Sequence, residues 1–153
     1  MEYASIEREI HIDATPEVVF EVVSSPVHIK EWWGAEADLE PTPGAVGELA
    51  WGRGTAEEHT ESITVVDAEP PRLFSFRWVY EGAAEATSTN SMLVTFELVP
   101  SGGGTRLRVT ETGFRARGWE IAVLEAAYHD HVQGWDRFVP AIGDYVARLV
   151  STP

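Results

Sequence analysis

A long amphipathic helical pattern near the end of the chain restricts the fold more than any other feature. Such spacing puts apolar side chains on one face of a helix, and that face must be buried against another element. Pro140 falls inside the pattern and is expected to kink or loosen the helix, because proline lacks an amide hydrogen. The preceding residues are also compatible with a helix, as a separate short one. The residues of the stripe recur every three or four positions: Val132, Trp135, Val139, Ile142, Val146 and Leu149.

Much of the chain before this helix alternates apolar and polar residues, as strands with one buried face do. Ile6, Ile10 and Ile12 alternate with charged residues near the start of the chain. A later stretch, "LFSFRWVY", places its aromatic residues on one face. The turn "SGGG" joins two more alternating stretches as a hairpin. We therefore predict about six antiparallel strands that need a cover on their apolar face.

Two short helices are expected between the first strand and the rest of the sheet. Thr15 is a good N-cap before Pro16, and Pro26 opens a second helix that ends at Trp32 and Trp33. Neighbouring residues on a helix point about 100° apart, so the two rings are not expected to share one core seam. We predict that Trp32 is the more buried ring and that Trp33 lies at the mouth of a cavity. The alternative is that both rings pack on two sides of one core.

The order of these elements predicts an α+β fold in which a curved antiparallel sheet surrounds the C-terminal helix. The chain of 153 residues is long enough for one sizeable core, so we expect a single domain over residues 1–153. There are no internal repeats and no low-complexity segments.

Four stretches resemble the heat-shock-protein-90 ATPase activator-like family of the START-like (SRPBCC) helix-grip superfamily: "ATPEVVFEVVSSPVHIKEWW", "EPPRLFSFRW", "VTFELVPSGGGTRLRVTETG" and "HVQGWDRFV". The resemblance implies an apolar cavity between the sheet and the long helix, which the superfamily uses for hydrophobic ligands. Two departures stand out. The additional N-terminal domain of eukaryotic members is missing, and the segment between Gly113 and Gly134 looks longer than usual.

Aromatic residues on the inner faces of the predicted elements favour the binding of a small hydrophobic or aromatic molecule in that cavity. Glu111 falls on the apolar face of its strand, where it is either a polar anchor for a ligand or a solvated residue at the sheet edge. Arg8 shares a face with isoleucines and should either extend to the rim or pair with an inward carboxylate. The expected ligand-binding residues are Trp33, Trp51, Phe76, Trp78, Tyr80, Phe96, Glu111, Tyr128, Trp135 and Val139.

The sequence contains no recognisable catalytic constellation, which favours a binding protein over an enzyme. The alternative is a cyclase, aromatase or hydrolase that uses Glu111, Tyr80 or His131 as an acid or base. A third hypothesis, a module that stimulates a chaperone ATPase, follows from the family resemblance, and the missing N-terminal domain counts against it. His129 and His131 are two positions apart, whereas metal ligands on a helix are usually three or four apart, so we expect no metal and no cofactor.

The charge of the chain limits its partners. A formal net charge of −14 argues against nucleic acid and against anionic membrane surfaces. The N-terminus does not resemble a targeting peptide, and the chain has no cysteine, so a cytoplasmic location is expected. The sequence leaves open whether the protein is a homodimer.

Overall fold

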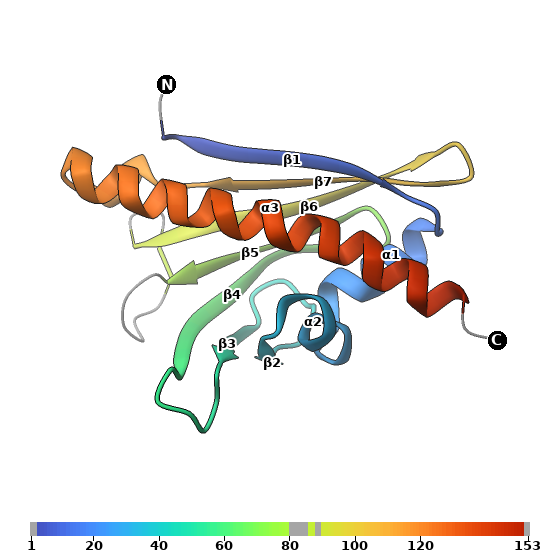
Figure 1. Ribbon diagram of the computed structural model, residues 1–153, viewed down its shortest axis with the longest axis horizontal. Coiled ribbons are helices and arrows are strands. Elements are labelled where there is room, and N and C mark those ends of the chain that lie inside the picture. Colours follow the sequence, from blue (N-terminus) through green and yellow to red (C-terminus); the bar gives the residue numbers. More distant parts are fainter. Residues whose placement is uncertain (1–2, 80–85, 88–89, 152–153) are drawn as a thin grey trace.

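The computed structural model describes residues 3–79, 86–87 and 90–151. Their strands form one antiparallel sheet in the order β1-β7-β6-β5-β4-β3-β2 (Figure 1). This is one strand more than the six expected, because Glu36–Asp38 is too short to show an alternating pattern. The strands are β1 (Ser5–Ile12), β2 (Glu36–Asp38), β3 (Val46–Trp51), β4 (His59–Glu69), β5 (Leu73–Val79), β6 (Ser91–Ser101) and β7 (Gly104–Thr112).

The hairpin between β6 and β7 forms at the predicted turn. Ser101 pairs with Gly104, so the loop consists of Gly102 and Gly103 alone. Both have positive φ angles, 57° and 84°, as a two-residue loop that matches the twist of its strands requires. The hairpin places β7 between β6 and β1 inside the sheet.

The two short helices begin and end where the sequence predicts. In α1 (Pro16–Ser24), the Thr15 hydroxyl accepts a hydrogen bond from the Val18 amide. In α2 (Pro26–Trp33), the helix ends at Gly34, whose φ of 74° is a left-handed conformation that glycine adopts without strain. This cap fixes the tryptophan pair at the last turn of α2.

The C-terminal helix α3 (Ile121–Ser151) is a single element of 31 residues. The expectation of a separate short helix before the amphipathic stripe is wrong, because the helical pattern continues through that segment. A 3-10 turn, η1 (Arg115–Arg117), lies between β7 and the start of α3. Pro140 lies within α3 on its exposed side, where water can satisfy the carbonyl that proline leaves without a partner. None of the helices in the described part of the chain is long and apolar enough to cross a membrane.

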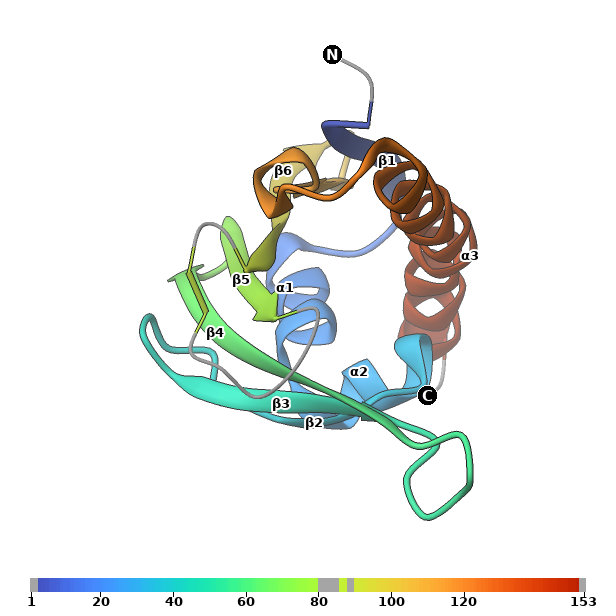
Figure 2. The ribbon, with the colours of Figure 1, turned by 90° about the vertical axis from the view of Figure 1, so that its left-hand side faces the viewer.

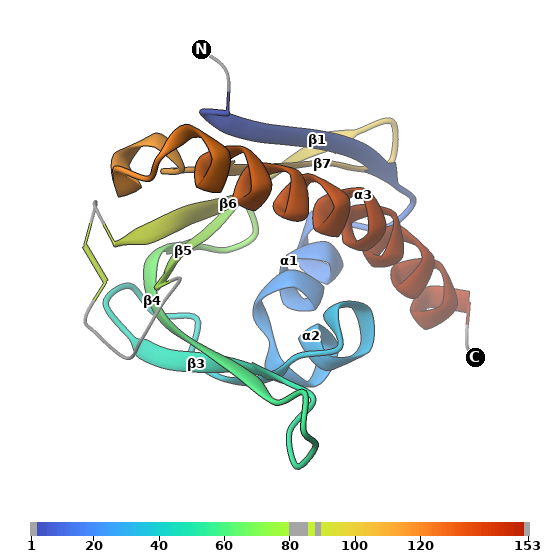
Figure 3. The ribbon, with the colours of Figure 1, turned by 60° about the vertical axis from the view of Figure 1, so that its left-hand side comes forward.

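The sheet curves from β1 to β2, and α3 lies across its open side (Figure 2). A bulge between Val65 and Asp67 in β4 contributes to this curvature, since a bulge bends its strand. Helix α3 packs on β1 at one side and on α2 at the other (Figure 3). Arg8 of β1 joins this packing by donating a hydrogen bond from Nε to Asp136 Oδ1 of α3 at 2.6 Å. The side chains are 36% and 55% exposed, so the partner of Arg8 is a surface carboxylate and not an inward one. The apolar core lies between the sheet and the three helices.

Candidate functional site

Glu111 is a fully buried carboxylate on the inner face of the sheet. It lies on β7 opposite Ile6 of β1 and Val94 of β6, and its exposed fraction is 0%. The alternative of a solvated residue at the sheet edge is therefore wrong, because β1 covers the side of β7 that the sequence left open. A buried carboxylate needs hydrogen-bond donors around it.

Three donors from two other elements meet this carboxylate. Trp78 Nε1 on β5 donates to Oε2 at 2.8 Å, and Trp135 Nε1 on α3 donates to Oε1 at 2.8 Å. His131 Nδ1, also on α3, lies 2.7 Å from Oε1. Indole N–H groups can only donate, so the carboxylate is the shared acceptor that ties α3 to the sheet.

The ionisation of His131 is governed by this arrangement. Burial of the ring lowers its pKa, but the hydrogen bond to Glu111 and the negative charges of Glu111, Asp130 and Glu61 more than compensate, so the pKa of His131 is raised. The side chain is 8% exposed. The imidazolium form is thus stabilised in a largely buried place.

The rings of Trp32 and Trp33 do not point in different directions, as the angle of about 100° between helix neighbours suggested. The rings of Trp32 and Trp33 stack with centroids 5.1 Å apart and planes 6° apart, and their exposed fractions are 3% and 5%. The expectation that the rings cannot share a seam is wrong, because the long tryptophan side chain can swing away from its Cα–Cβ direction. The rings differ in what they contact: Trp32 Nε1 donates to the Val22 carbonyl at 2.9 Å, whereas Trp33 lines a cavity.

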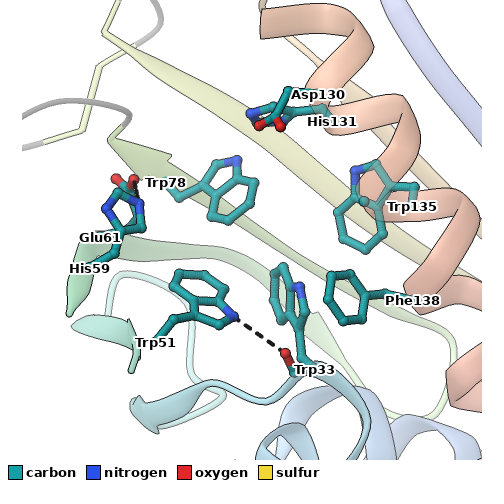
Figure 4. A pocket seen from close by; sticks show the side chains of 10 residues that line it. Trp33, Trp51, His59, Glu61, Trp78, Asp130, His131, Trp135 and Phe138 are labelled. Atoms are coloured by element: carbon teal, nitrogen blue, oxygen red, sulfur yellow. Dashed lines mark hydrogen bonds and ion pairs between the residues drawn. The ribbon is translucent and has the colours of Figure 1, made fainter. Parts of the chain in front are cut away.

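That cavity lies between α2, α3 and the inner face of β3, β4 and β5 (Figure 4). Its volume of about 410 Å³ falls in the range of roughly 300–1,000 Å³ that small-molecule sites occupy. Trp33 is central to its aromatic wall, with ring centroids 5.5 Å from those of Trp51, Trp78 and Trp135. The lining residues are Trp33, Trp51, His59, Glu61, Trp78, Asp130, His131, Gly134, Trp135 and Phe138.

The Nε1 of Trp33, in this wall, has no hydrogen-bond partner in the described part of the chain. No side-chain nitrogen or oxygen that is completely buried among those residues lacks a partner, so this nitrogen keeps some contact with solvent. The residue as a whole is only 5% exposed, and it lines the cavity. Its N–H is available to an acceptor on a bound molecule.

The rim of the cavity is acidic. Glu61 on β4 has a side chain only 7% exposed, and its Oε1 lies 2.6 Å from Nε2 of the exposed His59. Asp130 on α3 is exposed to solvent. Figure 4 shows Glu61 and Asp130 extending from β4 and from α3 around the tryptophan rings.

The structure gathers some of the expected ligand-binding residues and separates others. Trp33, Trp51, Trp78 and Trp135 line the cavity, and Glu111 lies behind two of them. Tyr128 points elsewhere and donates a hydrogen bond to the Ser5 carbonyl at 2.8 Å. The remaining aromatic and aliphatic candidates, Phe76, Phe96 and Val139, are buried in the core and do not line the cavity. Tyr80 lies outside the described residues.

Six residues that line the cavity were not among the expected ligand-binding set: His59, Glu61, Asp130, His131, Gly134 and Phe138. Of these, His131 was expected only as a possible acid or base. A signal for Glu61 was present, since it alternates in phase with the apolar Ile63 and Val65. Phe138 lies three residues after Trp135, and Gly134 lies four residues before Phe138, so the helical period also indicated them. In the part of the chain that is described, no three His, Cys, Asp or Glu side chains are grouped to hold a metal ion.

The fold and this site together define a class of protein. A curved antiparallel sheet, two short helices after β1 and a long C-terminal helix across an aromatic cavity constitute the helix-grip fold. Residues 13–147 match the family described as "Activator of Hsp90 ATPase homolog 1-like protein". The chain therefore belongs to this family.

Solved structures share this fold. Protein MLL2253 from Mesorhizobium loti is 23% identical with a TM-score of 0.75, and the match covers 94% of this chain and 97% of that one. The Aha1 protein from Colwellia psychrerythraea, solved as a dimer, is 18% identical with a TM-score of 0.66 and coverages of 92% and 93%. DynU16, a protein of the dynemicin biosynthetic locus, is 21% identical with a TM-score of 0.71; the match covers 94% of this chain but 47% of DynU16. A search of curated proteins found no match.

Proposed function

We propose that this protein binds a small, flat, largely apolar molecule in the cavity between α2, α3 and the sheet. The observation that carries the proposal is an aromatic cavity of about 410 Å³ whose wall includes Trp33, with an Nε1 that has no partner in the described residues. Apolar walls supply the affinity of such sites, and a few polar groups fix the orientation of the ligand. The fold shared with DynU16 is consistent with a small-molecule ligand.

The chemistry of the wall suggests how the ligand is held. Stacked and tilted rings favour contact with a planar ring system. An oxygen acceptor on that ring system would take the hydrogen bond of the Trp33 N–H. Trp78 and Trp135 donate to Glu111, so their rings are held in place before a ligand arrives. This rigidity reduces the entropy lost on binding.

Gly134 offers a direct test of the proposal. It lies on α3 between Asp130 and Phe138, one turn from each, and a Cβ added there would meet no atom within 4 Å. Since the Cβ has room and Gly134 lines the cavity, we expect Gly134→Leu to extend its side chain into the cavity. Leucine in a helix interior is also favoured over glycine by about 0.5–1 kcal/mol. Ala126→Leu, at an exposed position of the same helix, is the matched control.

The measurement is isothermal titration calorimetry with 2-naphthol, a flat two-ring molecule with one hydroxyl. We expect binding to the wild type and to Ala126→Leu, and at least ten-fold weaker binding to Gly134→Leu, which corresponds to about 1.4 kcal/mol. Unchanged affinity in Gly134→Leu, with its thermal stability retained, would place the ligand outside the cavity and refute the proposal.

A second candidate function is acid–base catalysis on the bound molecule. The observation that favours it is the hydrogen bond from His131 at the cavity wall to the buried Glu111, which raises the pKa of His131. In this function the neutral imidazole of His131, present above its folded-state pKa, would take a proton from a carbon of the bound molecule and release it to solvent, while Glu111 positions the ring. The test is the rate of Kemp elimination of 5-nitrobenzisoxazole as a general probe of a base in the cavity. A rate that is the same for wild type and for His131→Asn across the pH range would exclude it.

A further inference from the structure

The aromatic wall surrounds the cavity with ring faces at several angles. The planes of Trp51, Trp78 and Trp135 lie at 81°, 46° and 37° to that of Trp33, and Phe138 adds a fifth ring 6.5 Å from it. The face of an aromatic ring carries negative potential and attracts cations, tryptophan more than the other residues. Such a set of rings resembles the cages that hold organic cations.

The charged groups on the lining residues are mostly negative. Glu61 is largely buried at the rim and Asp130 lies across from it, whereas no lysine or arginine is found among the described lining residues. Glu111 lies behind the wall and is paired with His131, so the protonated His131 balances its charge. The whole chain carries a formal charge of −14, which raises the local concentration of cations around it.

His131 reports on the electrostatic potential in the wall. Burial lowers the pKa of an imidazole, yet the pKa of His131 is raised, because Glu111, Asp130 and Glu61 together stabilise its positive form. Asp130 and Glu61 also face the cavity. A positive group in the cavity would be stabilised by the same two carboxylates.

We infer that the preferred ligand of this cavity is an organic cation, a flat molecule that carries a protonated or quaternary nitrogen. The inference rests on the proposed function, because it requires that the cavity binds a small molecule at all. The cationic nitrogen would lie against the tryptophan faces near Glu61 and Asp130. An acceptor elsewhere on the molecule would take the N–H of Trp33, the unpartnered donor that identifies the cavity as a site independently of its acidic rim. Fatty acids and other anions are disfavoured by the same charges.

Three probes of nearly equal size separate charge from shape: N-methylquinolinium, 1-methylnaphthalene and 1-naphthoate. Calorimetric titration of each into the full chain at low ionic strength is expected to rank the cation first and the anion last. N-methylquinolinium should bind at least about ten-fold more tightly than 1-methylnaphthalene. The two probes have the same contact area, and the cation gains cation–π and carboxylate attraction in addition.

Two variants locate the origin of this preference. Glu61→Gln and Asp130→Asn each remove one negative charge with little change in shape. Each should lower the affinity for N-methylquinolinium about three-fold or more and leave the affinity for 1-methylnaphthalene unchanged. Asp130→Asn is at an exposed position, so it serves even if Glu61→Gln fails to fold. Glu125→Gln removes the same charge from an exposed position of α3 that does not line the cavity, and it should leave both affinities unchanged.

The outcomes distinguish the two proposals. Equal affinity for N-methylquinolinium and 1-methylnaphthalene, or equal effects of Glu125→Gln and Asp130→Asn, would overturn the cation inference and leave the cavity as a binding site for neutral molecules. Binding of none of the three probes, together with none of 2-naphthol, would overturn the proposed function itself.

Discussion

Replacing Glu111 with leucine removes the acceptor that joins β5, β7 and α3 while roughly preserving the volume of the side chain. The carboxylate is fully buried and accepts from Trp78 Nε1 and Trp135 Nε1, with His131 Nδ1 as its third neighbour. In Glu111→Leu both indole N–H groups lose their acceptor, whereas His131 can release its proton. The change therefore tests whether this hydrogen-bond network holds α3 on the sheet.

The magnitude follows from the two orphaned donors. A buried donor without an acceptor costs about 1–3 kcal/mol. This applies to Trp135, which is 3% exposed, whereas the partly buried Trp78 should cost less. Removing one partner of a buried charged pair typically costs about 3–5 kcal/mol. We expect Glu111→Leu to lower the free energy of unfolding by about 3 kcal/mol or more, which most domains of this size survive.

Glu111→Gln is the matched control. Its amide oxygen can still accept from one indole, but its NH₂ group faces another donor, so the loss should be smaller, about 1–2 kcal/mol. The assay is urea denaturation followed by far-ultraviolet circular dichroism, which reports on the secondary structure. A loss below about 1 kcal/mol in Glu111→Leu, within the range of ordinary surface substitutions, would refute the argument.

Two further predictions concern neighbouring side chains. The pKa of His131 is raised in the folded protein, so wild type should be more stable than His131→Asn, most of all below a pH of about 6.5. This difference in the free energy of unfolding should fall as the pH rises through the folded-state pKa. Urea denaturation measures it, and a difference that grows with pH would contradict the ion pair with Glu111. Trp32→Phe leaves the Val22 carbonyl without its donor, whereas Trp33→Phe removes an N–H that has no partner in the described residues. Trp32→Phe should therefore lower the free energy of unfolding by about 1 kcal/mol more than Trp33→Phe does. Equal losses of stability in the two variants would contradict this assignment.

Much of the fold could be predicted because each element carries a local signal. The threonine cap and the prolines mark the short helices, and the apolar stripe marks the long one. Strand β2 had no such signal, because its three residues are held mainly by pairing with β3. Gly47 of β3 shows how close that pairing is, since a Cβ there would lie 1.8 Å from the Asp38 carbonyl oxygen.

The site was harder to predict because it depends on contacts between distant elements. The alternating pattern placed Glu111 on the apolar face, but it could not show that β1 covers β7 or that two indoles donate to the carboxylate. The helical angle between Trp32 and Trp33 suggested divergent rings, whereas rotation about the side-chain bonds stacks them. Local periodicity thus predicts which face a residue occupies, and tertiary packing decides what it contacts there.

The indole region of a ¹H–¹⁵N correlation spectrum tests the central claim most directly, since the chain has six tryptophans and each contributes one N–H signal. Titration with 2-naphthol should shift the Trp33 signal most, with smaller shifts for Trp51, Trp78 and Trp135. The Trp32 signal, whose N–H donates to a backbone carbonyl away from the cavity, should move little. In Gly134→Leu these shifts should disappear. Shifts that persist in Gly134→Leu, or an unmoved Trp33 signal at saturating ligand, would contradict a binding site in this cavity.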